Sequence, residues 1–328
     1  MKKPSLRLPL RAFGTALLIG ASSSAAVAAT SDACDLSVAS GPAGKVYEQI
    51  VRDMRAVCGN VVSMCTLNTK GGVQNLQMLS SNEAELGLVQ IDLLHKLKDS
   101  DENIGALKAV MPLHANLLHV VTLAEGSMVD VMFVPGTRTK VPYSGRKVVL
   151  GRFSDLRGMT VALVGSADLT AQVLNERLQY GLRLVSAATD EAALTMLKSG
   201  EVQAVFTLAG WPMPVLVTQP SGSGLQLAEF DVEPWEPYKT TRRNYQNLGA
   251  LNLKMLAVPN LLVSRQFKAG GTQGQRVSSL QTCLIQKLDE LREGRYHPIW
   301  KEIKDTADTH GWPRWVAEPA ATQKSVRK

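Results

Sequence analysis

The stretch that indicates the fold class reads LSVASGPAGKVYEQIVRDMRAV and covers residues 36–57. Residues 36–40 are mostly apolar and are typical of a short buried strand, whereas the glycine- and proline-rich residues Gly41–Gly44 are typical of a turn. From residue 45 to residue 57 the apolar side chains recur with the period of a helix. The stretch therefore predicts a strand–turn–helix unit.

Further units of this kind follow along the 328-residue chain, which is long enough for two lobes. Strands are expected over residues 61–67, 86–89, 160–164, 182–185 and 202–208, and helices over 73–81, 169–180 and 189–199. Alternation of strands and helices predicts an α/β fold with a mainly parallel sheet covered on both faces.

The first 28 residues have the composition of a secretory signal peptide. They contain four basic residues and no acidic residue, then an apolar stretch over 12–21, and they end in Ala26-Val27-Ala28. The apolar stretch is shorter than the roughly 20 residues that span a bilayer. We therefore expect cleavage near Ala28 and an exported, soluble protein of the periplasm, with an anchoring helix as the alternative.

The formal net charge of +7 invites a nucleic-acid or membrane-surface interpretation. Removing the four positive charges of the leader from the +7 of the full chain leaves +3, and much of this lies over residues 138–152 and in the C-terminal tail. Aromatic residues form only 5% of the chain, and export separates the protein from nucleic acids. No nucleic-acid partner is expected.

The four cysteines, Cys34, Cys58, Cys65 and Cys283, all follow the predicted cleavage site. An even number in an oxidising compartment permits two disulfides. Cys34 opens the first strand and Cys58 ends the following helix, and those two ends can lie at one edge of a sheet. The expected pairing is therefore Cys34–Cys58, with Cys65 and Cys283 left as either free or bonded. No C-x-x-C motif supports a zinc site.

Between the two series of units, residues 128–153 predict a β-hairpin. Its strands are expected over 131–134 and 147–150, with a turn at Pro135-Gly136. Five basic residues gather here, namely Arg138, Lys140, Arg146, Lys147 and Arg152. The hairpin is either a solvated loop or a contact surface for an acidic partner.

The sequence contains no motif that favours an enzyme. There is no G-x-S-x-G nucleophile elbow and no glycine-rich nucleotide loop followed by Lys-Ser or Lys-Thr. His114 and His119 are five residues apart and do not share a helical face, so a zinc pair is not expected there. We expect no catalytic residues, no metal site and no cofactor.

Several short motifs occur in a fixed order: GPAGKVY at 41–47, TKGGVQNL at 69–76, EAELGLVQID at 83–92, DLRGMTVA at 155–162, Gly165-Ser166, KSGEVQAVF at 198–206 and GWPMP at 210–214. This ordered series, over roughly residues 35–265, resembles the TAXI-type solute-binding proteins of tripartite ATP-independent periplasmic (TRAP) transporters. The opening loop departs from that pattern with Pro42, Ala43 and Lys45, and the hairpin connection is longer than usual.

The resemblance implies a type II periplasmic-binding-protein fold, with two α/β lobes joined by a hinge around a ligand cleft. Lobe 1 would combine residues 29–124 and 250–328, lobe 2 would span 155–249, and residues 125–154 would connect them. The implied ligand is a small organic acid or amino acid, such as a dicarboxylate or glutamate, delivered to TRAP-type membrane subunits. The alternative is a TAXI-like sensor or adaptor that regulates a partner protein through the basic hairpin.

Candidate ligand-binding residues follow the strands, because ligands bind beyond the carboxyl ends of strands in open α/β sheets. Glycine loops that open helices suit anions, since their backbone N–H groups are free. The loop candidates are Ser40, Gly41, Gly44, Thr69, Lys70, Gly71, Gly72, Gln90, Asp92, Gly165, Ser166 and Ala167. Asp92 is expected either to bind a ligand ammonium or to cap the next helix, and Tyr47 and Trp211 either to line the cleft or to pack in the interior.

Overall fold

The computed structural model describes residues 34–133, 137, 139–268 and 270–316, which belong to one compact unit that begins at Cys34. The predicted signal peptide, residues 1–28, lies outside the described residues, as do the hairpin turn Pro135-Gly136 and Arg138. Within the described ranges, no helix is long and apolar enough to cross a bilayer.

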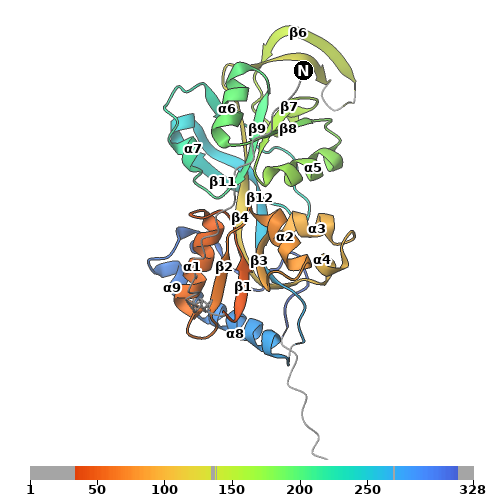
Figure 1. The fold of residues 1–328 in the computed structure, drawn as a ribbon. Coiled ribbons are helices and arrows are strands. Elements are labelled where there is room, and N and C mark those ends of the chain that lie inside the picture. Colours follow the sequence, from red (N-terminus) through yellow and green to blue (C-terminus); the bar gives the residue numbers. More distant parts are fainter. Residues whose placement is uncertain (1–33, 134–136, 138, 269, 317–328) are drawn as a thin grey trace, which may run out of the picture. The chain divides into compact units, whose positions relative to one another are not determined.

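Lobe 1 consists of strand–helix units from the start of the chain and of helices from its end (Figure 1). The first part contains β1 (Leu36–Ala39), α1 (Val46–Cys58), β2 (Met64–Leu67), α2 (Gly72–Ser80), β3 (Leu86–Gln90), α3 (Ile91–Leu97) and α4 (Glu102–Ala106). The second part contains α8 (Thr272–Gln286), α9 (Leu288–Glu293) and η3 (Pro298–Glu302). The apolar stripe of α1 is buried as predicted, at positions such as Ile50 and Met54.

Lobe 2 consists of the second series of units. It contains η1 (Phe153–Leu156), β7 (Thr160–Val164), α5 (Ala167–Leu178), β8 (Arg183–Ala187), α6 (Asp190–Ser199), β9 (Ala204–Ala209), α7 (Pro214–Val217), β10 (Leu225–Leu227), β11 (Lys239–Tyr245) and η2 (Gln246–Leu248). Its interior includes the packed aromatic rings of Phe153, Phe206 and Phe230.

Two long strands, β4 (Lys108–Leu123) and β12 (Ala250–Ser264), pass between the lobes (Figure 1). The strand order is β2-β1-β3-β12-β4-β9-β7-β8. The two long strands therefore lie at the centre of the sheet, between the strands of lobe 1 and those of lobe 2. The outer strands pair in parallel, whereas β12 runs antiparallel to β3 and β4, and β4 antiparallel to β9. This arrangement confirms the predicted α/β, type II periplasmic-binding-protein fold, but the sheet is mixed and not mainly parallel as predicted, because the two long central strands run antiparallel to their neighbours.

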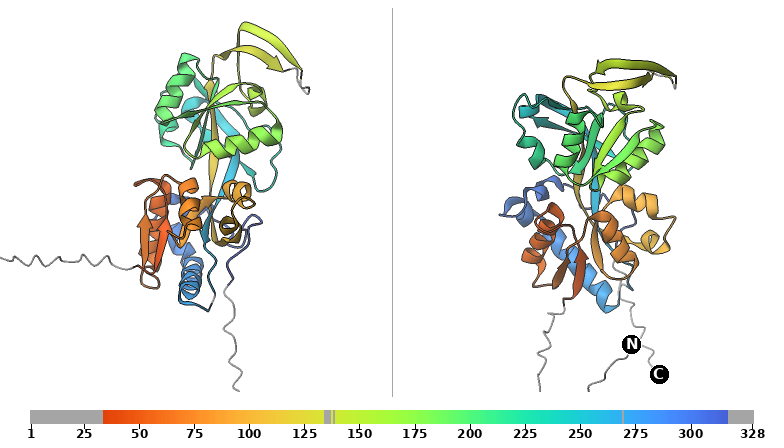
Figure 2. Two further views of the ribbon diagram at one scale, coloured as in Figure 1. Left: turned by 45° about the vertical axis from the view of Figure 1, so that its right-hand side comes forward. Right: turned by 45° about the horizontal axis from the view of Figure 1, so that its top comes forward.

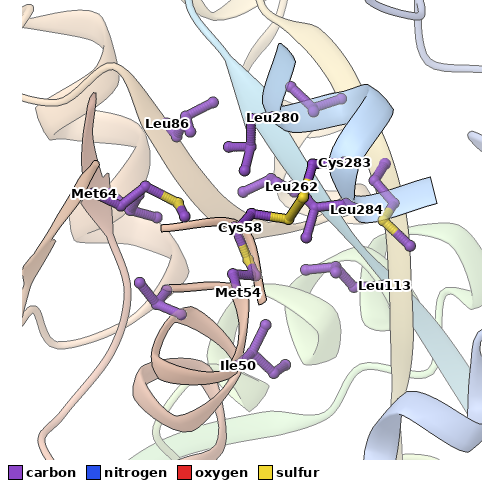
Figure 3. Close-up of a cluster of buried hydrophobic side chains, with 14 of the residues drawn as sticks. Ile50, Met54, Cys58, Met64, Leu86, Leu113, Leu262, Leu280, Cys283 and Leu284 are labelled. Atoms are coloured by element: carbon purple, nitrogen blue, oxygen red, sulfur yellow. A yellow bond between two sulfur atoms is a disulfide. The ribbon is translucent and has the colours of Figure 1, made fainter. Parts of the chain in front are cut away.

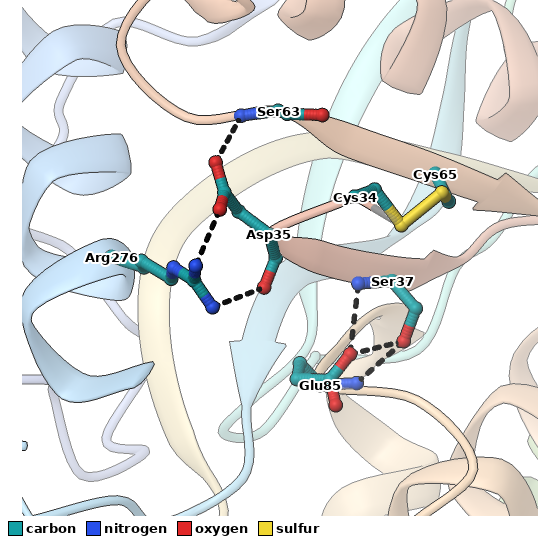
Figure 4. Close-up of a disulfide and its surroundings, with 7 residues drawn as sticks. All are labelled: Cys34, Asp35, Ser37, Ser63, Cys65, Glu85 and Arg276. Carbon is teal, nitrogen blue, oxygen red and sulfur yellow. Dashed lines mark hydrogen bonds and ion pairs between the residues drawn. A yellow bond between two sulfur atoms is a disulfide. The ribbon is translucent and has the colours of Figure 1, made fainter. Parts of the chain in front are cut away.

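The disulfides pair differently from the prediction. Cys34 is bonded to Cys65 and Cys58 to Cys283, with Cα–Cα distances of 5.6 Å and 6.0 Å, so the predicted Cys34–Cys58 pair is wrong. β1 lies directly beside β2, which brings Cys34 to Cys65 (Figure 4). The end of α1 faces α8, so Cys58 meets Cys283 in the apolar interior of lobe 1 (Figure 3).

An ion pair supports the same corner of lobe 1. Asp35 accepts a hydrogen bond from the backbone N–H of Ser63 at 2.9 Å, and its carboxylate lies 2.6 Å from the guanidinium of Arg276 on α8 (Figure 4). The start of β1 is therefore attached both to the adjoining strand and to a helix from the far end of the chain.

The predicted hairpin is present, but its strands differ from the expected 131–134 and 147–150: the first begins four residues earlier, and the second begins seven residues earlier and ends two residues earlier. β5 (Ser127–Phe133) and β6 (Lys140–Val148) form a separate antiparallel two-stranded sheet. Figure 2 shows this hairpin on the side of lobe 2 that faces away from lobe 1. Its side chains Met132, Tyr143 and Val148 pack against the core of lobe 2, and Lys140, Arg146 and Lys147 are exposed.

Candidate functional site

A cleft of about 1500 Å³ is lined by residues from both lobes and from the two strands that connect them. Lobe 1 contributes the loops after β1 and β2, and lobe 2 contributes the starts of α5 and α6 and the loop after β9. The segment around η3 forms a further wall. Among the predicted residues, those that line the cleft are Gly44, Tyr47, Lys70, Gly71, Gly72, Ser166 and Trp211.

The loop Lys70–Gly72 places a lysine and the N-terminal end of a helix at the cleft, and both are positive. It leads directly into α2, whose first N–H groups and helix dipole favour an anion. Gly71 has φ +115°, a backbone conformation that glycine adopts without strain. Lys70 is exposed beside this helix start, so a ligand carboxylate can meet both a full positive charge and backbone donors.

Other predicted residues support the cleft loops from beneath and do not line the cleft. The Thr69 hydroxyl donates to Asn75 Oδ1 at 2.5 Å, and the Asn75 amide donates to the backbone oxygen of Ser40 at 2.5 Å. A side-chain Cβ at Gly41 would lie 3.1 Å from Tyr47 Cβ, so the loop passes close to Tyr47. Gly165 occupies a turn with φ +60°, and Ala167 is fully buried in the core of lobe 2.

Gln90 and Asp92 connect the two lobes. The Gln90 amide donates to Ser166 Oγ at 3.1 Å. The Asp92 carboxylate, at the start of α3, accepts hydrogen bonds from Thr170 Oγ1 at 2.6 Å and from Tyr238 Oη at 3.1 Å. Burial raises the pKa of Asp92, although these hydrogen bonds oppose the shift. Both residues are buried and neither lines the cleft, so they hold the lobes together along one side.

A buried polar cluster lies where β4 and β12 cross between the lobes. Tyr47 Oη donates to Asn260 Oδ1 at 2.5 Å, and the Asn260 amide donates to the backbone oxygen of His114 at 2.9 Å. Burial lowers the pKa of His114 to about 4, so this imidazole is neutral at pH 7. His114 Nε2 lies 3.1 Å from Asn116 Oδ1, and Asn116 also lines the cleft.

Asn116 and Asn260 are site residues that were not predicted from the sequence. Both lie in strands with apolar sequences, and only their polarity within those strands could have drawn attention to them. Their partners come from residues that are distant along the chain: the amide of Asn260 reaches His114, 146 residues away. The cluster therefore forms only when the two long strands pair.

Lobe 2 brings acidic residues to the cleft that were also not predicted. Asp190 and Glu191 begin α6 and line the cleft. Thr207 Oγ1 donates to Asp190 Oδ1 at 3.0 Å and orients that carboxylate. Burial raises the pKa of Asp190, and the positive charge of Lys45, which lines the cleft from lobe 1, opposes this shift. Charges of both signs thus face the same space.

The wall at Trp211 contains two further charged residues that were not predicted, Arg243 on β11 and Glu302 in η3. The Arg243 guanidinium lies over the Trp211 ring, 5.3 Å from its centre, and its Nη2 lies 3.5 Å from Glu302 Oε1. In the described part of the chain, no group of three or more His, Cys, Asp or Glu side chains is arranged to hold a metal ion.

No protein-family model and no curated protein matches the sequence. The chain is similar to the periplasmic VFT2 domain of BvgS from Bordetella pertussis, with 15% identity, a TM-score of 0.44, and coverage of 82% of this chain and 93% of that one. An arginine periplasmic binding protein from Legionella pneumophila shows 11% identity and a TM-score of 0.44, over 83% and 100% of the two chains. The GluR0 ligand-binding core in complex with L-glutamate shows 15% identity and a TM-score of 0.46, over 77% and 95%.

Proposed function

We propose that the protein is an exported receptor that captures a small organic acid or amino acid between its lobes. The observation that carries this proposal is the cleft itself, a space of about 1500 Å³ to which the two lobes bring charged groups of both signs. Large concave sites between lobes, with a few convergent polar groups, are where small ligands bind. The proposal includes no enzymatic step.

The charges in the cleft suit a ligand with a carboxylate. Lys70 and the start of α2 would bind that carboxylate, because helix N-termini and lysine both attract anions. Asp190 would bind the ammonium group of an amino acid, and this contact would favour its ionised form. With a ligand that has no ammonium group, the positive charge that Asp190 interacts with would be that of Lys45.

We further propose delivery of the ligand to a TRAP-type membrane transporter. The ordered sequence motifs support this partner, and the basic leader followed by an apolar stretch supports export into the periplasm. Two disulfides suit an oxidising compartment.

Thermal-shift screening and calorimetry of the protein lacking residues 1–28 test ligand capture. A ligand at 100 times its Kd should add about 2.7 kcal/mol to the free energy of unfolding. Lys70→Gln should weaken carboxylate binding, whereas Lys98→Gln provides a matched control at an exposed lysine outside the cleft. Absence of any shift across organic acids, amino acids and sugars would refute the receptor.

A sensor or adaptor role is the second candidate, and the separate hairpin favours it. Lys140 and Arg146 are exposed on this sheet, as is Lys147, which pairs with Glu125 at 3.0 Å; Figure 2 shows the sheet on the side of lobe 2 that faces away from lobe 1. Reversing the charge of Lys140 and Arg146 separates the roles. A sensor would keep its ligand affinity and lose regulation of its partner, whereas a transport receptor that does not use this surface would keep ligand uptake in cells.

A further inference from the structure

One wall of the cleft presents an exposed aromatic ring. Trp211 lies in the loop between β9 and α7, lines the cleft, and has 37% of its surface exposed. Large apolar side chains in a concave site are available to contact a ligand, and an indole offers both a flat apolar surface and an N–H donor. A glutamate-like ligand has no large apolar surface to pack against the flat face of the ring.

The loop that carries Trp211 is held by buried contacts. The backbone N–H of Met213 donates to Tyr245 Oη at 2.8 Å, and the same oxygen lies 2.8 Å from His119 Nε2. Burial lowers the pKa of His119 to about 4 and raises the pKa of Tyr245 to about 12, so both side chains are neutral at pH 7. Because the ring is attached to a supported loop, little ordering is needed when a ligand binds.

Arg243 places a cation beside this ring. Its guanidinium lies 5.3 Å from the centre of the Trp211 ring, and Nη1 donates to Thr241 Oγ1 at 2.7 Å. Nε is buried and has no hydrogen-bond partner among the residues that the structure describes. Glu302 Oε1 lies 3.5 Å from Nη2, at the long end of a charge-assisted contact; burial raises the pKa of Glu302 and the positive charge of Arg243 opposes this shift. Nη1 also donates to the backbone oxygen of Arg242 at 3.1 Å, so two hydrogen bonds orient the guanidinium and Nη2 is the group that a ligand carboxylate would meet.

Apolar side chains also line the cleft that holds this pair, together with charged ones such as Lys301 and Lys304. Ile299 and Ile303 from the C-terminal segment line the same cleft as Met213 and Val215 from lobe 2. Ile299 Cδ1 lies 3.4 Å from the position that a side-chain Cβ would occupy at Gly210, so this wall adjoins the Trp211 loop. The cleft of about 1500 Å³ also exceeds the roughly 300–1000 Å³ that is typical of small-molecule sites.

We propose that Trp211 and Arg243 form a subsite for an aromatic carboxylate. The inference rests on the proposed receptor function and narrows its ligand class; in an aromatic acid, Arg243 binds the carboxylate that Lys70 would bind in a glutamate-like ligand. The ligand ring packs against the indole and the apolar wall, and the ligand carboxylate pairs with the guanidinium of Arg243 in place of Glu302. This subsite favours an aromatic acid over a dicarboxylate of glutamate size. Only the aromatic acid can both pack a ring against Trp211 and pair a carboxylate with Arg243.

Calorimetry with the protein lacking residues 1–28 tests the subsite. The probes are 3-phenylpropionate, its uncharged amide 3-phenylpropionamide, propionate without a ring, and L-glutamate. The aromatic acid should bind at least about tenfold more tightly than each of the other three, as expected for loss of one charge-assisted contact or one buried ring.

Three variants locate the binding. Arg243→Met keeps the length of the side chain without its charge, and it should weaken 3-phenylpropionate about tenfold to a hundredfold. Trp211→Leu should weaken it about tenfold. Arg242→Met is the matched control, because Arg242 is the adjacent residue on β11, donates to the Asn252 backbone oxygen and does not line the cleft. Arg242→Met should leave affinity unchanged.

The outcomes separate this inference from the proposed function. If L-glutamate binds and 3-phenylpropionate does not, or if the amide binds as tightly as the acid, the subsite is wrong and the receptor stands. Equal effects of Arg243→Met and Arg242→Met would also overturn the subsite. If none of these probes and no other organic or amino acid binds, both the subsite and the receptor are overturned.

Discussion

Removal of the Cys58–Cys283 disulfide should destabilise the protein more than removal of Cys34–Cys65. The two bonds close loops of very different length, with sequence separations of 225 and 31 residues. In the chain-entropy model, cross-links of these lengths stabilise the folded state by about 5.4 and about 3.7 kcal/mol at 25 °C. The difference arises because the longer loop has more conformational freedom in the unfolded chain.

Packing adds to this difference. Cys58 is fully buried and Cys283 nearly so, among the apolar side chains of α1 and α8 (Figure 3). Substitution of both cysteines by alanine removes two buried sulfur atoms and leaves space in a close-packed interior, which lowers stability further. A typical domain has only about 5–15 kcal/mol in total, so the variant should be close to the limit of folding.

The measurement is urea unfolding of the parent, of Cys58→Ala/Cys283→Ala and of the matched double variant Cys34→Ala/Cys65→Ala. Denaturation midpoints and slopes give the free energy of unfolding for each protein. Affinity for any ligand found by screening should be unchanged in the folded fraction, because none of the four cysteines lines the cleft. An equal or smaller loss for the Cys58–Cys283 pair would refute the loop-length reasoning.

Three further predictions concern the buried polar groups and the glycine loop. Because burial raises the pKa of Asp92 above its ordinary 3.8, the folded state binds this proton more tightly than the unfolded state. The stabilisation that the protonated Asp92 carboxyl gives the folded state is therefore full below pH 3.8 and is lost as pH rises through the folded pKa. Urea unfolding at several pH values should show this fall in the free energy of unfolding. Asp92→Asn should abolish this pH dependence. Tyr47→Phe removes the nearer of the two donors to Asn260 Oδ1 and leaves only Asn116 Nδ2 at 3.5 Å, so it should cost about 1–3 kcal/mol in urea unfolding; an unchanged midpoint would contradict the Tyr47 contact. Gly71→Ala places a side chain at φ +115° and should cost about 1–3 kcal/mol while weakening carboxylate binding; calorimetry with unaltered affinity would show that the start of α2 is not used.

Much of the fold was predictable because it depends on local patterns. Apolar runs followed by glycine turns and helical periodicity identified the units β1–α1 and β7–α5, and the Pro-Gly turn with flanking apolar residues identified the hairpin. These signals lie within a few residues of one another, so no knowledge of distant contacts was needed. The glycine loop Lys70–Gly72 was found in the same way, since a helix start after a strand is a local feature.

Contacts between distant segments were decided only in three dimensions. The sequence alone determined that Asp92 follows a strand, and both a ligand contact and a helix cap suited that position. Packing of α3 against α5 directs its carboxylate to Thr170 in lobe 2. Likewise, Cys58 has the same local sequence whichever cysteine it bonds, and the position of α8 against α1 selects Cys283. Arg243 meets Trp211 because β11 pairs with β12 and places it beside the loop after β9. Periodicity reports which face of an element is buried, and only the assembled sheet determines which distant side chains share that space.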